Sequence, residues 1–227
     1  MLFASSEDQG RSLEELNLGD TGLDIDGVIC VTSVLNWNNS SLRALSLDSP
    51  EYKSIGQECA IHFAKMLQVN RGLEKLSLRK NQLNCDAIYT IKQLCLENNR
   101  LRVLDLAANK IAFKGAEAIH DILTSKFCVL EALNLSSNRL GHYGAKAISQ
   151  ALAKNRTLIH LDLTRNSIDD NGLKMLAESL ETNDSLLSLK LYFNDFGQQS
   201  LREFHKLAKR MEKVTTYWDF TTYVVDN

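Results

Sequence analysis

The residues of this chain that are best suited to acid–base chemistry are one histidine and two aspartates. His160 and Asp162 are one residue apart, so on a strand they share a face, where the carboxylate can accept a hydrogen bond from the imidazole. Asp105 lies two predicted strands away from Asp162, about 10 Å by the usual strand spacing, which is too far for the two carboxyl groups to share a proton. No exposed serine or cysteine accompanies them as a nucleophile, so we predict that His160 is an ordinary surface side chain.

Sequence motifs for the common cofactor and metal sites are absent. The chain contains no G-x-x-x-x-G-K-[ST], no G-x-G-x-x-G and no H-E-x-x-H. The other histidines fall in separate segments and cannot be grouped at the spacing of metal ligands; they are His62, His120, His142 and His205. We therefore predict a protein that is not an enzyme and that holds no cofactor and no metal ion.

The candidate residues are positioned by a sequence frame, L-x-x-L-x-L-x-x-N-x-L, that recurs along the chain. The frame fits fully from three leucines and less completely from four others. In chain order it starts at Leu13, Leu42, Leu73, Leu101, Leu130, Leu158 and Leu186, with separations of 29, 31, 28, 29, 28 and 28 residues. Self-similarity at this period predicts a repeat protein in which each unit packs on its neighbours.

Each repeat is predicted to contain a short strand, a turn and a helix. The alternation Leu133-x-Leu135 turns two leucines to one face and leaves the intervening residues on the solvent face. Because a helix separates successive strands, neighbouring strands must be parallel. Helices are about 10 Å wide and strands lie about 4.8 Å apart, so stacking must curve the sheet inward and place the helices outside.

Asparagine and glycine recur at the turns. The asparagines of the frame are predicted to stack in a column that satisfies the backbone groups of buried turns; they are Asn81, Asn109, Asn138, Asn166 and Asn194. Thr21 and Pro50 occupy this position in the first two repeats, where we expect the column to stop. A glycine found fourteen residues into most repeats, such as Gly115, is expected to allow close approach of the turn to the helix.

The 28- and 29-residue units, with their Gly-Ala pairs and A-I-x-x-x-L helices, resemble the ribonuclease-inhibitor-type leucine-rich repeats. The resemblance covers residues 13 to about 225. It implies an α/β fold: a right-handed leucine-rich-repeat solenoid, or horseshoe, with a parallel sheet on the concave face and helices on the convex face. It also implies a function like that of related arrays, which commonly serve as ligand-binding or regulatory modules. Among these are inhibitors, innate-immune sensors, actin-capping proteins and parts of ciliary assemblies.

Three parts of the chain are predicted. Residues 1–12 form an N-terminal lead that is too short for a complete cap, residues 13–213 form seven repeats, and residues 214–227 form a degenerate C-terminal capping strand. A 29-residue step from Leu186 places Trp218 and Phe220 at the two core positions of that strand. The uncapped N-terminal edge indicates a piece or isoform of a longer array, an edge that contacts another protein, or a tolerated edge.

The composition gives no indication of binding to polyanions or membranes. The 26 basic and 28 acidic residues give a net charge of −2, which produces no long-range field that would favour nucleic acid or an anionic membrane. No segment reaches about 18 consecutive apolar residues, and the five cysteines lack C-x-x-C pairing, which is typical of a reducing compartment. We predict a cytoplasmic location, with cytoskeletal or ciliary association as the family resemblance implies.

We predict a protein-protein interaction scaffold that binds a partner protein through its concave face or its exposed ends. The candidate partner-binding residues form one patch toward the C-terminal end of the concave face: His160, Asp162, Lys190, Tyr192, Tyr217 and Asp219. Aromatic residues with charged neighbours are favoured at the centres of protein interfaces. The alternative is a regulator that acts on an enzyme in trans, such as a GTPase-activating protein of the Ran GTPase-activating type, with Arg79 and the asparagine column as its candidate groups.

Overall fold

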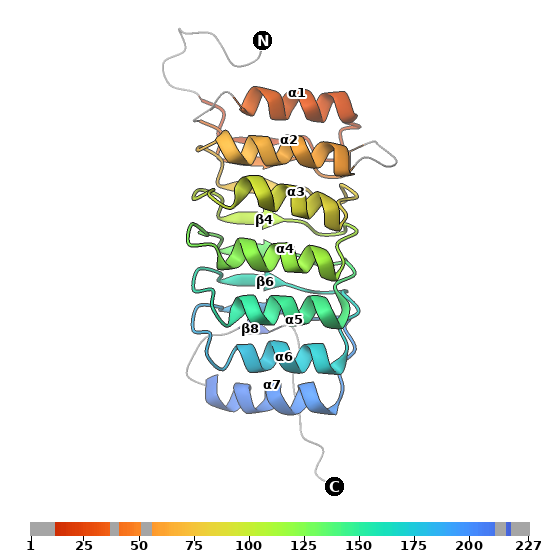
Figure 1. Ribbon diagram of the computed structural model, residues 1–227, viewed down its shortest axis with the longest axis vertical. Helices are drawn as coiled ribbons and strands as arrows, with labels where there is room; N and C mark the ends of the chain where they lie inside the picture. Colours follow the sequence, from red (N-terminus) through yellow and green to blue (C-terminus); the bar gives the residue numbers. More distant parts are fainter. Residues whose placement is uncertain (1–11, 37–40, 51–55, 212–216, 219–227) are drawn as a thin grey trace.

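Residues 12–36, 41–50, 56–211 and 217–218 are the part of the chain that the computed structural model describes, and they form one stack of strand–helix units (Figure 1). The strands are β1 (Glu15–Asn17), β2 (Ala44–Ser46), β3 (Lys75–Ser77), β4 (Val103–Asp105), β5 (Ala132–Asn134), β6 (His160–Asp162), β7 (Ser188–Lys190) and β8 (Tyr217–Trp218). The helices are α1 (Ile25–Leu35), α2 (Gly56–Val69), α3 (Cys85–Cys95), α4 (Phe113–Thr124), α5 (Gly141–Leu152), α6 (Asp170–Ser179) and α7 (Gln198–Met211). Strands and helices alternate, as the repeat frame predicts.

The strands form a single parallel sheet in which each strand pairs with its neighbours in the sequence, from β1 to β8. The register keeps the middle leucines aligned, as in the pairing of Leu104 with Leu133. At the C-terminal end Ser188 pairs with Tyr217, which confirms the register of the 29-residue step. Phe220 lies outside the described residues, as does the rest of the predicted capping strand at 214–227 apart from β8 itself.

The sheet is shorter than the helical layer that covers it. In Figure 1, β8 lies level with α5, whereas α7 lies two helices farther along the stack. Helices about 10 Å wide cannot stack at the strand spacing of about 4.8 Å, so the helices splay and the sheet curves. The architecture is therefore the predicted α/β solenoid, with the parallel sheet on the concave face and the helices on the convex face.

Leucines of the frame and small residues of the helices form the core between the two layers. Leu104, Leu133 and Leu161 are 6%, 3% and 1% exposed. Burial of each such side chain stabilises the fold by roughly 1.5–3 kcal/mol. A Cβ atom at Gly115 would lie 2.6 Å from the side chain of Ile111, in the turn before α4. This contact confirms that the repeated glycine allows the turn to approach the helix closely.

The asparagines of the frame form the predicted column, in which each amide joins two adjacent repeats. The Nδ2 group of Asn138 donates to the backbone oxygens of Leu106, in the preceding repeat, and of Leu135, in its own repeat, each at 3.0 Å. Its Oδ1 atom accepts from the backbone N–H of Ile111 at 3.0 Å. We call this column the ascending ladder, because it lies in the loops that follow strands. The same three bonds, with the corresponding partners, recur at Asn109, Asn166 and Asn194.

The ascending ladder ends where the sequence predicts. Asn81 reaches back to the second repeat, where its Nδ2 group donates to the backbone oxygen of Leu47 at 2.8 Å. In that repeat the corresponding position holds Pro50, which has no side-chain donor. In the first repeat the Thr21 hydroxyl donates to the backbone oxygen of Leu18, at 2.7 Å, within its own loop. The first two repeats are therefore not joined by an amide at this position.

A second asparagine column, not predicted from the sequence, joins the repeats where helices lead into strands. Asn155 is 4% exposed, and its Nδ2 group donates to the backbone oxygen of Leu123, in the preceding repeat, at 2.8 Å. Its Oδ1 atom accepts from the backbone N–H groups of Thr157 and Leu158 at 3.0 and 2.8 Å. We call this column the descending ladder. Its other members are Asn70, Asn98 and Asn183, with Ser125 in the fourth repeat.

The N-terminal edge of the stack is less well covered than the interior. Leu13 is 45% exposed and Leu16 in β1 is half-buried, whereas Leu45, its partner in β2, is 2% exposed. Of the predicted lead at 1–12, all residues except Ser12 lie outside the described part of the chain. The domain boundaries, and the expected partner contact at this edge, therefore stay predictions.

A carboxylate of the sixth repeat caps the helix of the seventh. The oxygens of Asp170 accept from the backbone N–H groups of Gly197, Gln199 and Ser200 at 3.0, 3.1 and 2.8 Å. These groups lie at the start of α7, where the first N–H donors lack helical partners and the helix dipole favours an anion. Partial desolvation raises the pKa of Asp170, but the hydrogen bonds outweigh it and lower the pKa below its ordinary value of 3.8.

We predict that Asn138→Ala lowers the free energy of unfolding by about 2–3 kcal/mol. The substitution leaves the buried Ile111 N–H without its acceptor, and an unsatisfied buried group costs about 1–3 kcal/mol; it also removes one donor each from the oxygens of Leu106 and Leu135. Urea unfolding followed by circular dichroism measures the change. Asn171→Ala, at an exposed position of α6, is the control and should stay within about 0.5 kcal/mol of wild type. If both variants lose the same free energy of unfolding, the ladder asparagine contributes no more to stability than an exposed asparagine does.

The stability lost in Asp170→Asn is predicted to depend on pH. Because the folded pKa is lower than the unfolded one, the contribution of the carboxylate is fully present above pH 3.8 and disappears as the pH falls through the folded pKa. The variant should therefore be less stable than wild type at pH 7, and the difference should shrink below pH 3.8. Urea unfolding across this pH range tests this, with Asp184→Asn, whose side chain is 88% exposed, as the control. A difference that does not vary with pH would contradict the role of the charge.

Candidate interaction surface

The concave face has short side chains over the middle of the sheet and charged ones toward β7. A hollow of about 270 Å³ lies over β4 to β7, and another of about 550 Å³ lies over β1 to β4. Ala132 and Ser188 line the first hollow together with His160, Asp162 and Lys190. Since the strand residues beside each buried leucine point away from the core, the predicted concave positions are the ones that the structure brings to this surface.

Three of the predicted site residues lie together in this hollow. Asp162 pairs in register with Lys190, whose Nζ atom lies 3.9 Å from the Asp162 Oδ2 atom. An ion pair of this length, with its lysine exposed, contributes little stability. The Oδ1 atom of Asp162 accepts from the backbone N–H of Thr164 at 2.9 Å. The hydrogen bond considered between His160 and Asp162 does not form among the described residues, because the carboxylate is turned toward the loop and the next strand.

The remaining members of the predicted patch are less closely placed. Tyr192 follows β7, is 54% exposed, and meets Phe193 edge to face with 4.4 Å between ring centroids. Tyr217 lies in β8 and pairs with Ser188. Asp219 lies outside the described residues. That all six residues form one contiguous patch therefore stays a prediction.

The ends of several strands are capped by their own side chains, which the sequence reading missed. Asp105, Asn134 and Asp162 end β4, β5 and β6, and each accepts through Oδ1 from the backbone N–H two residues later, at 2.9, 3.0 and 2.9 Å. Asn17 does the same at the end of β1, at 2.9 Å. Asp and Asn commonly make this local bond, which is called an Asx turn. The carboxylates that first suggested chemistry are thus partly committed to the backbone.

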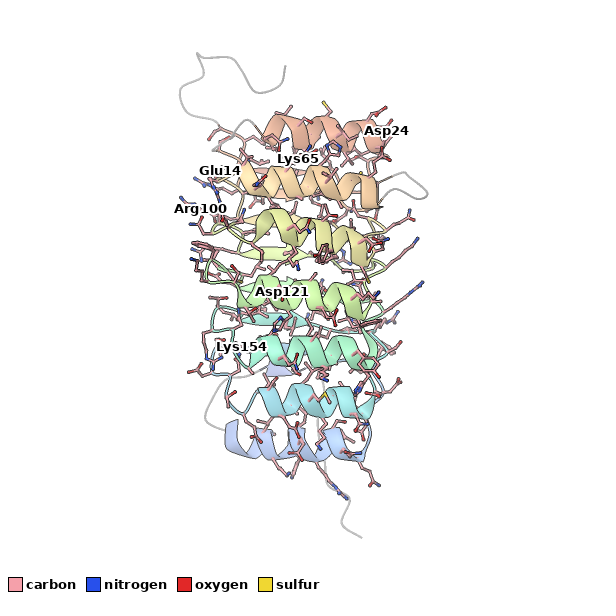
Figure 2. The ribbon with its side chains drawn as sticks, viewed as in Figure 1. Glu14, Asp24, Lys65, Arg100, Asp121 and Lys154 are labelled. Carbon is pink, nitrogen blue, oxygen red and sulfur yellow. The ribbon has the colours of Figure 1, made fainter. Side chains whose placement is uncertain are left out.

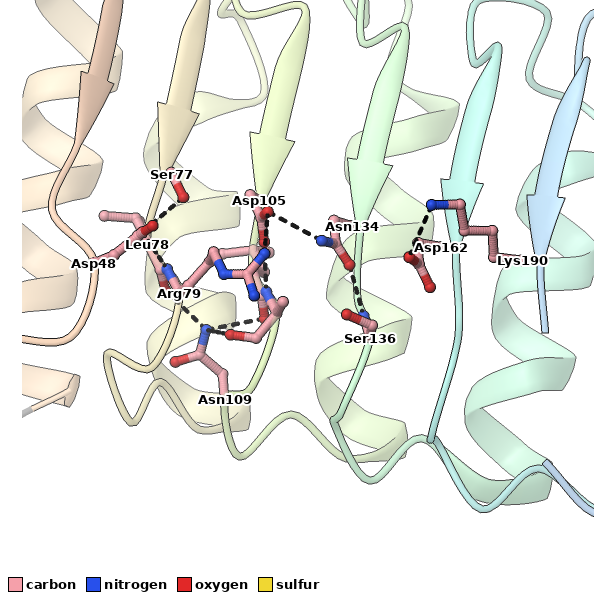
Figure 3. Close-up of polar contacts among 12 residues, drawn as sticks. Asp48, Ser77, Leu78, Arg79, Asp105, Asn109, Asn134, Ser136, Asp162 and Lys190 are labelled. Carbon is pink, nitrogen blue, oxygen red and sulfur yellow. Dashed lines mark hydrogen bonds and ion pairs between the residues drawn. The ribbon is translucent and has the colours of Figure 1, made fainter. Parts of the chain in front are cut away.

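Figure 3 shows that two of these caps, Asp105 and Asn134, are joined across the sheet. The Oδ2 atom of Asp105 accepts from the Asn134 amide at 3.0 Å and lies 3.3 Å from the Arg79 guanidinium. At β3, which ends in serine, Asp48 of the preceding repeat accepts from the Ser77 hydroxyl at 2.6 Å and from the Arg79 N–H at 2.9 Å. Arg79 is therefore held at the sheet by its side chain and its backbone together.

The same contacts bear on the alternative of a regulator that acts in trans. Its candidate groups were Arg79 and the frame asparagines. Arg79 is paired with Asp105, and Asn81 and Asn166 are 0% exposed and bonded to the backbone. The asparagines are therefore committed to the backbone, whereas Arg79 is paired but its side chain is still 46% exposed.

The two rims of the horseshoe can be told apart in Figure 2. We call the loops that follow strands the ascending rim; they include residues 78–84, 106–112, 135–140, 163–169 and 191–197. We call the loops that precede strands the descending rim. Asp24 marks the first rim in the figure, and Glu14, Arg100 and Lys154 mark the second.

Some charges on the descending rim are paired between adjacent repeats. The pairs join Arg43 with Glu74, Arg102 with Glu131, and Arg156 with Asp184. On the ascending rim, four exposed cations take part in no ion pair with any described residue; they are Lys80, Lys110, Arg139 and Arg165. The same holds for Arg71, Arg100, Lys126 and Lys154 on the descending rim, so both rims carry exposed positive charge.

The described residues give no indication of a metal site or of a membrane-spanning helix. The described part of the chain holds no group of histidine, cysteine and acidic side chains arranged for a metal ion. None of the described helices combines the length and the apolar composition that crossing a bilayer requires. Cys30, Cys85 and Cys128 are free thiols.

Comparisons with known proteins agree with the repeat frame. Residues 97–119, 128–149 and 154–177 match the family model described as leucine-rich repeat. Leucine-rich repeat-containing protein 34 of Mus musculus is 33% identical over 176 residues, which are 64% of this chain and 41% of that protein. RAN GTPase-activating protein 2 of Arabidopsis thaliana is 25% identical over 139 residues, which are 60% of this chain and 25% of that protein. The chain spans less than half the length of these curated relatives.

A solved structure shares the fold. The C-terminal domain of tropomodulin from Caenorhabditis elegans aligns with a TM-score of 0.53 and 14% sequence identity, over 69% of this chain and 91% of that one. At this identity the likeness concerns the fold alone. Together, the family match, the relatives and the parallel sheet with its period of 28 to 31 residues lead to one assignment. The chain belongs to the leucine-rich repeat proteins of the ribonuclease-inhibitor-like type.

Proposed function

We propose that the chain is a protein-binding module that takes up a segment of a partner protein on its concave face, over β4 to β7. Leucine-rich repeat domains typically serve as protein-interaction modules. The observation that carries the proposal is the hollow of about 270 Å³, where short side chains leave space and His160, Asp162 and Lys190 supply polar groups.

The chemistry of the hollow suits a polar segment. Lys190 is exposed, Asp162 is partly buried, and the two are 3.9 Å apart, so partner groups can replace their mutual contact with little loss of stability. His160 offers a donor and an acceptor on the same face. Tyr192, exposed at the end of β7, offers a large contact area with few rotatable bonds.

The backbone beneath the hollow is fixed before a partner arrives. Strands β4 to β7 are paired on both sides, and both asparagine ladders hold the loops at their ends. Binding then orders side chains rather than loops, which reduces the entropic cost of association. This supports recognition by a preformed surface.

Two narrower roles have less support. Similarity to RAN GTPase-activating protein 2 is the observation that favours a trans-acting regulator as a second candidate function. GTP hydrolysis by small GTPases, measured with and without the chain, tests it, and no acceleration would dismiss it. Tropomodulin shares the fold alone, so the expected cytoskeletal or ciliary association stays a prediction.

We predict that Ala132→Arg abolishes or weakens capture of a concave-face partner at least about tenfold. Ala132 lies in the floor of the hollow, and a long cation there fills the space and adds an unpaired charge. Proteins retained from cell extract by the immobilised wild-type chain are identified by mass spectrometry, and the affinity of each purified partner is then measured for both chains.

Glu117→Arg, which introduces the same side chain at an exposed position of α4 on the convex face, is the matched control. It should leave the affinity within about twofold of wild type, and both variants should unfold at the wild-type temperature. A partner whose affinity falls equally in the two variants, or falls only in Glu117→Arg, would place binding elsewhere than the concave face.

A further inference from the structure

The ascending rim carries four cations that no described acid neutralises. Lys80, Lys110, Arg139 and Arg165 are exposed and lie in the consecutive loops after β3, β4, β5 and β6. We call them the rim stripe. Lys110 donates to the neutral side-chain oxygen of Gln82 at 3.1 Å, which leaves its charge uncompensated. On the descending rim Arg43, Arg102 and Arg156 are paired with acids of the next repeat. Arg71, Arg100, Lys126 and Lys154 on that rim form no ion pair with a described residue, so the ascending rim is singled out by the aromatic pair at its C-terminal end.

An exposed aromatic pair lies at the C-terminal end of the rim stripe. Phe193 is 60% exposed and Tyr192 is 54% exposed, and the Arg165 guanidinium lies 4.3 Å from the centroid of the Phe193 ring. Phe193 has a φ of +56°, a left-handed conformation that is unfavourable for a bulky residue. The corresponding residues of the other repeats are polar or small. The turn of the repeat thus imposes the left-handed conformation, and Phe193 differs from its equivalents in placing a large, exposed apolar side chain there.

We propose that the rim stripe and Phe193 bind an extended acidic segment of a partner protein. Adjacent loops of the rim lie between about 5 Å apart, at the sheet, and about 10 Å apart, at the helices. Alternate residues of an extended chain point to the same side and are about 6.6–6.8 Å apart. Acidic residues at every second position of the segment therefore fall near successive loops, and an apolar residue after the last acid packs on Phe193 and Tyr192. Lys80 and Arg165 precede the frame asparagine of their loops. Lys110 and Arg139 follow it, so the long side chains have to take up this offset.

The loops that carry the rim stripe are already fixed. Each of its cations is adjacent in sequence to an asparagine of the ascending ladder, and these amides bond to the backbone of two repeats. The backbone of the stripe is thus ordered before binding, so association has to restrict only side chains. Charge complementarity in such a surface raises the association rate and makes the affinity depend on salt.

A protein segment fits this surface better than a nucleic acid. Asp105 and Asp162 end β4 and β6, beside the loops that carry Lys110 and Arg165. These carboxylates repel a continuous polyanion that extends onto the concave face. A peptide whose acidic residues are separated by neutral ones can place its acids beside the cations of the rim stripe and its neutral residues beside the carboxylates.

The test uses the full chain and a fluorescent peptide in which four glutamates alternate with threonines and a leucine follows the last glutamate. Fluorescence anisotropy is expected to give half-saturation below about 100 µM at about 50 mM salt, and weaker binding at about 300 mM. The double variant Lys110→Glu, Arg139→Glu should weaken binding at least about tenfold. Arg100→Glu, Lys154→Glu makes the same change of net charge on the descending rim and should change the affinity less than about twofold.

The variant Phe193→Gly tests whether the Phe193 ring contributes to peptide binding without contributing to the stability of the fold. Glycine removes the aromatic contact and adopts a positive φ without strain, so peptide affinity should fall at least about threefold while the midpoint of thermal unfolding stays equal or rises. Ala132→Arg should leave peptide affinity unchanged, so this inference and the concave-face proposal can fail separately. The inference is overturned by any of three results: no half-saturation below about 100 µM, equal weakening in the two double variants, or tighter binding of a single-stranded RNA of the same charge than of the peptide.

Discussion

The structure depends above all on the hydrogen bonding of buried backbone groups by asparagine side chains. Strands of three residues leave most of each repeat in turns and helix ends, and turns packed between repeats cannot use water as a partner. In the ascending ladder, the amide of Asn138 serves backbone groups of two repeats at once. Asn155 does the same in the descending ladder. The leucines supply the free energy of apolar burial, whereas the amides fix the spacing of the loops, because each amide has to reach both neighbours.

At some positions another side chain takes the place of a ladder asparagine, and these positions show how adjacent repeats are joined. Ser125 keeps the descending bond to the previous helix with a hydroxyl, which donates to the backbone oxygen of Leu96 at 2.8 Å. At the other end of the helical layer Asp170 joins the sixth and seventh repeats through the N–H groups of α7. In the first repeat the hydroxyl of Thr21 bonds locally, and there Leu16 is only half-buried. A few polar contacts per interface thus couple adjacent repeats in addition to the strand pairing and the apolar core, as expected for an array with nearest-neighbour contacts.

The fold was predictable because its information is periodic. The spacing of leucines gave the strand order, and the alternation within Leu133-x-Leu135 gave the concave positions. The descending ladder also has a period, since Asn70, Asn98, Asn155 and Asn183 each stand three residues before a frame leucine, but no rule of local structure singled them out. The capping by Asp162 and the stacking of Arg165 on Phe193 depend on which way a side chain turns. A residue pattern does not contain that information, so it could not predict which charged side chains of the surface are engaged with neighbours and which are not.

The partner binding that we propose depends on residues that the repeat does not need. Asp105 and Asn134 are engaged with each other and with strand ends, and Arg79 is held by Asp105, so these polar groups mainly maintain the concave face. His160 and Phe193 are different, because in the described part of the chain neither side chain bonds to a backbone group, and both lie in or just after strands of the paired sheet. Since each repeat contacts only its neighbours, a change at such a position alters the surface without altering the frame. One fold can in this way acquire many partners, and the identity of the partner is set by side chains that the leucines and asparagines leave free.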